Sequence, residues 1–113
     1  MSQITTHVLD TTRGRPAAGV PVTLEMLSVD GPIVLGSGAT DREGRLTDIL
    51  VDELELEAGR YRLRFDSGTY FREQGTRTFY PEVVVIFEVR DPGERYHIPL
   101  LLSPYGYTTY RGT

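Results

Sequence analysis

Apolar and polar residues alternate with a period of two along much of this chain. In residues 60–66, Tyr61, Leu63 and Phe65 alternate with three arginines, which is typical of an antiparallel strand with one buried face. Residues 20–29 alternate in the same way, and other segments are rich in β-branched residues. Together these patterns predict about eight strands, at residues 4–10, 20–29, 33–39, 45–50, 60–66, 82–89, 96–103 and 105–111.

Residues 67–74 are the one segment predicted to be helical. Ser67 can cap the N-terminus of this helix, and Gly75 can end it. Eight short strands and one short helix in 113 residues predict an all-β fold. We expect a sandwich of two sheets that forms one domain over residues 1–113.

The strand at residues 96–103 is apolar on both faces. Ile98, Leu100 and Leu102 share one face, while Pro99 and Leu101 share the other. A sandwich buries only one face of each strand, so Leu101, like Leu9, would need a cover from outside the domain. An oligomer interface on the outer face is the simplest cover. The alternative is that single exposed leucines are ordinary in proteins.

Composition excludes several classes of partner. The net charge of −4 argues against nucleic-acid binding, which needs a clustered positive surface. No apolar run approaches the roughly 18 residues of a membrane span, so we expect no membrane association. The first six residues have neither the basic nor the apolar region of a signal peptide. A cytoplasmic location is therefore expected.

The two histidines, His7 and His97, both lie in predicted strands. Histidine exchanges protons near neutral pH, because its unperturbed pKa is about 6.5. Period-two counting places His7 on the face of Leu9 and His97 on the face of Leu101, away from the predicted core. Considered alone, such histidines are more often surface or interface residues than catalytic ones. The chain has no cysteine and no close pair of histidines, so no metal and no cofactor are expected.

Three segments resemble the transthyretin family. They are residues 7–17 (HVLDTTRGRPA), the turn at residues 40–45 (TDREGR) and residues 96–109 (YHIPLLLSPYGYTT). Two of these motifs are long and lie near opposite ends of the chain, and the resemblance covers essentially its whole length. It implies a transthyretin-like (prealbumin-like) sandwich of two four-stranded sheets. It also implies a homotetramer with active sites at the dimer–dimer interface, in a channel lined by the first strand and the last two.

The family has two functional branches. One carries thyroid hormone, and the other hydrolyses 5-hydroxyisourate, the first product of urate oxidation, to 2-oxo-4-hydroxy-4-carboxy-5-ureidoimidazoline. The carrier branch has Lys and Thr at the positions of His7 and His97, whereas the hydrolase branch has both histidines and a terminal Tyr-Arg-Gly-Ser. This chain has both histidines and Arg45, and its last residues depart from the hydrolase motif only in Thr for Ser: Tyr110, Arg111, Gly112 and Thr113.

The resemblance therefore implies an enzyme that acts on a small molecule. His7 and His97 would form the acid/base and water-positioning pair. The resemblance does not indicate which of them is the base. Arg45 stays charged at any working pH and would stabilise an oxyanion, while Tyr110, Arg111, Gly112 and Thr113 would close the site and bind the substrate. The alternatives are a carrier of an aromatic ligand in the same channel and a purely structural sandwich, which would leave these residues unexplained.

Overall fold

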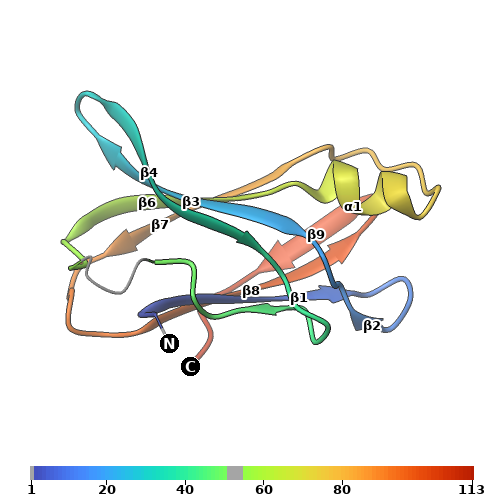
Figure 1. The fold of residues 1–113 in the computed structure, drawn as a ribbon, viewed down its shortest axis with the longest axis horizontal. Coiled ribbons are helices and arrows are strands. Elements are labelled where there is room, and N and C mark those ends of the chain that lie inside the picture. Colours follow the sequence, from blue (N-terminus) through green and yellow to red (C-terminus); the bar gives the residue numbers. More distant parts are fainter. Residues whose placement is uncertain (1, 51–54) are drawn as a thin grey trace.

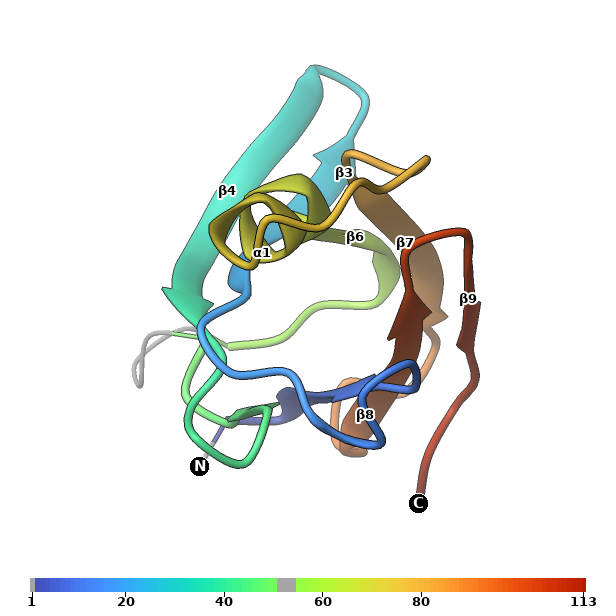
Figure 2. The same cartoon turned by 90° about the vertical axis from the view of Figure 1, so that its right-hand side faces the viewer.

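The computed structural model describes residues 2–50 and 55–113, whose strands form two sheets packed face to face (Figures 1 and 2). The first sheet has the order β2-β1-β8-β9, with β5 also paired to β1, and the second has the order β4-β3-β6-β7. The predicted two-sheet sandwich is confirmed, but the described residues form nine strands, five in the first sheet and four in the second, rather than two sheets of four. The strands are β1 (Ile4–Asp10), β2 (Arg15–Pro16), β3 (Pro21–Ser28), β4 (Gly31–Ala39), β5 (Arg45–Leu46), β6 (Gly59–Phe65), β7 (Val83–Val89), β8 (Tyr96–Ser103) and β9 (Gly106–Thr109).

The first sheet is organised around β1 and β8, which run parallel. Their register pairs Thr5 with His97 and Leu9 with Leu101. Residues 4, 6, 8 and 10 of β1 are buried, while Thr5, His7 and Leu9 between them are half-buried. The two strands therefore present His7 and His97 on the same outer face, as the alternation predicted.

The core lies between the inner faces of the two sheets. Val8 and Leu100 from the first sheet, and Leu24 and Leu63 from the second, are at most 1% exposed. On β6 the predicted alternation holds, because Tyr61, Leu63 and Phe65 are buried and the arginines between them are not. Removal of this apolar surface from water is what holds the sheets together.

The short helix α1 (Ser67–Glu73) covers one end of the sandwich (Figure 1). Its N-cap is Asp66, not Ser67 as predicted, because the Asp66 side chain accepts the N–H of Thr69 at 3.0 Å. The Ser67 hydroxyl instead donates to the carbonyl of Tyr80. Gly75 does end the helix, with a positive φ of 67°. Within the described residues, no helix has the length and hydropathy needed to cross a membrane.

Three segments differ most from the predicted strands. The segment predicted as a strand at residues 45–50 pairs only at Arg45–Leu46, because the chain then leaves the sheet and buries Ile49 and Leu50 in the core. The last strand stops at Thr109, and beyond it only Gly112 forms an isolated bridge, with His97. In the predicted loop at residues 11–16, Arg15–Pro16 pairs with the end of β1 as β2.

Candidate active site

A tight turn at residues 41–44 positions Arg45. The Asp41 carboxylate accepts the N–H groups of Glu43 and Arg45 at 2.8 and 2.9 Å. The bond from Arg45 is the main reason that the pKa of Asp41 lies below its ordinary value. Gly44 has φ +79°, and a Cβ there would lie 2.3 Å from the carbonyl oxygen of Val8, so only glycine fits. The turn thus docks on β1 and places Arg45 opposite His7 in the β1–β5 register.

The same turn holds the His7 ring. Nε2 of His7 lies 2.8 Å from the carbonyl oxygen of Glu43. A carbonyl oxygen can only accept a hydrogen bond, so Nε2 must carry a proton. In the neutral ring, Nδ1 is then the nitrogen that can accept a hydrogen bond.

His97 is half-buried, and its Nδ1 lies 2.8 Å from the hydroxyl of Thr5 on the neighbouring parallel strand. Burial, followed by the positive charge of Arg45 and the nearby His7, lowers the pKa of His97 below 6.5, although a hydrogen bond to the backbone of Thr5 opposes the shift. The lowered pKa favours the uncharged ring, which is the state that a proton acceptor requires.

The C-terminal segment lies directly against this ring. The N–H of Gly112 donates to the carbonyl oxygen of His97 at 2.8 Å. A Cβ at position 112 would lie 2.6 Å from Cδ2 of His97 and 3.2 Å from Cγ of Pro99. Glycine is therefore required for this close approach, and Pro99, although on the outer face, is buried.

These groups border a cavity of about 510 Å³, which is within the range of small-molecule sites. The guanidinium groups of Arg45, Arg95 and Arg111 make this cavity positively charged. This charge suits the polar edge of a ligand that carries or develops negative charge. The cavity is lined by Ser2, Gln3, Thr5, Arg45, Thr47, Arg95, His97, Arg111, Gly112 and Thr113.

Most of the residues predicted from the sequence come together here. Arg45, His97, Gly112 and Thr113 line the cavity. Arg111 lines it as well, but its guanidinium binds Glu94 at 2.9 Å.

Two predicted residues lie beside the cavity. His7 does not line it and lies alongside as the strand partner of Arg45. Tyr110 lines a second cavity of about 220 Å³, which shares His97 and Arg111 with the first.

Thr5 and Arg95 also line the cavity, although they were not predicted from the sequence as site residues. Arg95 directly precedes the motif that contains His97, and Thr5 shares the face of His7, two positions earlier. Only the parallel register shows that Thr5 reaches His97. Among the residues that the structure describes, no three His, Cys, Asp or Glu side chains gather in a way that could hold a metal ion.

Comparisons with known proteins identify the family and the fold that this chain resembles. A family model described as the HIUase/Transthyretin family matches residues 4–112. The 5-hydroxyisourate hydrolase of Salmonella typhimurium is 44% identical over 110 residues, which cover 97% of this chain and 80% of the relative. The solved transthyretin of Sparus aurata has a TM-score of 0.91 at 30% identity and covers 99% of this chain and 97% of its own. The 5-hydroxyisourate hydrolase structure of Klebsiella pneumoniae has a TM-score of 0.83 at 31% identity and covers 97% and 92%.

The substitution Gly112→Ala tests the contact between the C-terminal segment and His97. The added methyl group must displace the ring or the segment, so water gains access to the imidazole and the pKa of His97 rises. A titration of the imidazole by NMR measures this change. Gly106→Ala is the matched control, because a Cβ there would meet nothing closer than 3.8 Å. Identical His97 titration curves for wild type and Gly112→Ala would contradict the close contact.

Proposed function

This chain belongs to the HIUase/transthyretin family, and we propose that it opens the ring of 5-hydroxyisourate by hydrolysis in the breakdown of urate, in the cytoplasm. The observation that carries the proposal is the cavity that brings His97, Arg45 and the C-terminal segment together, and burial lowers the pKa of that histidine. The product would be 2-oxo-4-hydroxy-4-carboxy-5-ureidoimidazoline.

The choice between a hydrolase and a carrier depends on the residues of the site. The fold is similar to those of a transthyretin and of a hydrolase alike, so it does not separate the two activities. The curated relatives at 40–44% identity, in contrast, are named 5-hydroxyisourate hydrolases. His7 and His97 also stand where the carrier branch has Lys and Thr. The chain is an enzyme.

His97 acts as the general base in this proposal. When Nδ1 donates to the hydroxyl of Thr5, Nε2 is left to take a proton from water. The hydroxide oxygen bonds to the acyl carbon, the C–N bond breaks, and the departing nitrogen receives the proton. His7 positions the water through Nδ1. General base catalysis of this kind contributes about 10²–10⁴-fold in rate.

Arg45 stabilises the charge that develops on the carbonyl oxygen during the attack. Its guanidinium cannot act as a base, but its fork of donors suits an oxyanion. Gly112 and Thr113 border the substrate, while Tyr110 and Arg111 contact it from the same segment or hold that segment in place.

We also propose that the protein is a homotetramer with active sites at the dimer–dimer interface. The half-buried Leu9 and Leu101 lie on the outer face with the histidines, where a second subunit would cover them. The strands β7 and β9 end their sheets and expose Val84, Ile86 and Tyr107. Such edges pair readily with another chain.

Loss of either histidine is expected to abolish most activity. In an assay that follows the absorbance of 5-hydroxyisourate generated by a urate oxidase, the wild type accelerates its decay. His7→Ala and His97→Ala each lower kcat/KM by about 100-fold or more, with unchanged circular dichroism. A variant within about twofold of wild type would remove that histidine from the mechanism, and an inactive wild type would overturn the function.

Arg45→Lys keeps the positive charge but loses the planar fork of donors. We expect kcat to fall about 100-fold, as for removal of one oxyanion-stabilising group. Arg42→Lys, an exposed change in the same turn, is the control and retains activity. Wild-type activity in Arg45→Lys would show that charge alone matters at this position.

Light scattering tests the assembly. We expect four times the mass of the 12.7 kDa chain at micromolar concentration. Leu101→Arg, which places a charge on the proposed interface, is expected to lower this mass and the activity together. A monomeric and fully active wild type would refute the tetramer.

A further inference from the structure

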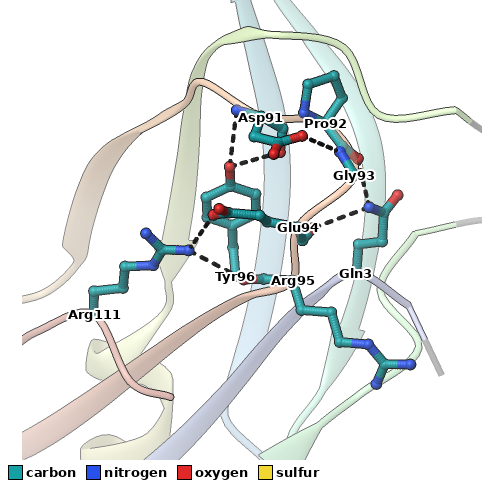
Figure 3. Close-up of polar contacts among 8 residues, drawn as sticks. All are labelled: Gln3, Asp91, Pro92, Gly93, Glu94, Arg95, Tyr96 and Arg111. Carbon is teal, nitrogen blue, oxygen red and sulfur yellow. Dashed lines mark hydrogen bonds and ion pairs between the residues drawn. The ribbon is translucent and has the colours of Figure 1, made fainter.

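The turn between β7 and β8 connects both ends of the chain through a network of polar contacts (Figure 3). Residues 91–95 form this turn, and Tyr96 follows it as the first residue of β8. Three of its residues, Gln3, Arg95 and Arg111, line the cavity of the proposed active site, but none of them is a proposed catalytic group.

Tyr96 fixes the turn internally. Its hydroxyl donates to the carbonyl oxygen of Asp91 at 2.7 Å and accepts the N–H of the same residue at 3.2 Å. The Asp91 carboxylate accepts the N–H of Gly93 at 2.8 Å, and its carbonyl accepts the N–H of Glu94. The turn therefore presents Glu94 in a defined place.

On one side the turn holds the start of the chain. The side-chain amide of Gln3 donates to the carbonyl oxygens of Pro92 and Glu94 at 2.6 and 3.0 Å (Figure 3). The N–H of Tyr96 donates back to the carbonyl oxygen of Gln3 at 2.7 Å. These bonds set the entry into β1, two residues before Thr5.

On the other side the turn holds the end of the chain through Arg111. Its guanidinium donates to the Glu94 carboxylate at 2.9 Å and to the carbonyl oxygen of Arg95 at 3.4 Å. It also lies over the Tyr96 ring, 4.7 Å from the centroid, within range for a cation–π interaction. Arg111 thus reaches away from the strand ladder and anchors the segment that follows β9.

We propose that Glu94 is a positioning residue of the active site. Through Arg111 it holds Gly112 and Thr113 against His97, so this inference rests on the proposed function. After Thr109 the sheet contributes only the bridge between Gly112 and His97, and the ion pair to Glu94 supplies the side-chain anchor one residue earlier.

The exposure of this pair separates positioning from general stability. The side chains of Arg111 and Glu94 are 60% and 50% exposed, and ion pairs so exposed contribute little to global stability. Loss of the pair would therefore free the last residues without unfolding the domain. The effect should appear in the order of Gly112 and in catalysis.

The test compares Glu94→Gln with Glu82→Gln. The control breaks another exposed ion pair, between Glu82 and Arg64, with the same 2.9 Å contact and 41% and 44% exposure, on the other sheet. Glu94→Gln is expected to accelerate hydrogen exchange of the Gly112 amide about two- to fivefold, the range that an exposed ion pair supports, with an unchanged Tm. Unchanged exchange at Gly112, or equal acceleration in Glu82→Gln, would overturn the proposal even if the protein had a different substrate.

A double-mutant cycle with Arg111→Met gives the second readout. Glu94→Gln alone is expected to lower kcat/KM about two- to fivefold, and to lower it no further when Arg111 is already Met. An equal loss in both backgrounds would show that Glu94 acts on the site without Arg111 and would refute the proposed route. An inactive wild type would instead refute the proposed function, while the amide exchange would still decide the role of Glu94.

Discussion

The parallel pairing of β1 with β8 is the constraint on which the rest of the site depends. It aligns Thr5 with His97 across 92 positions of sequence and places both histidines on one outer face. All the other described strand pairs are antiparallel. The first and last parts of the chain thereby line one cavity. The turn at residues 41–44 is hydrogen-bonded to β1, and the turn at residues 91–95 contacts Gln3 and Arg111.

This arrangement also sets the chemistry. A lone imidazole on an exposed strand would be partly protonated near neutral pH. Here burial and the neighbouring Arg45 charge lower the pKa of His97, and in the proposed mechanism the same arginine stabilises negative charge. The two roles are compatible because a cation that lowers the pKa of the base also favours an oxyanion. The core of the sandwich lies between the two sheets, whereas His7 and His97 lie on the outer face of the first sheet.

The sequence predicted what depends on local pattern. Alternation along β6 and β8 gave the inner and outer faces correctly. The short motifs predicted Arg45 and the two histidines as site residues, and of these Arg45 and His97 line the cavity. It could not predict what depends on distant contacts. The N-cap of α1 is Asp66 rather than the predicted Ser67, because the Ser67 hydroxyl donates to the carbonyl oxygen of Tyr80. Arg111 binds Glu94, which belongs to a turn 17 positions earlier in the sequence. The residues next to Arg111 in the sequence do not predict this contact.

The pH dependence of kcat/KM, measured beside the NMR titration of His97 in the same protein, tests whether His97 is the general base. His97 must be neutral to accept a proton, so activity should fall as the pH decreases through its pKa. We expect the acidic limb and the His97 titration to share one midpoint, and this midpoint to lie below pH 6.5. A His97 pKa above 6.5 would contradict the effect of burial and Arg45 on this ring. An acidic limb that does not follow the titration of His97 would show that His97 is not the general base.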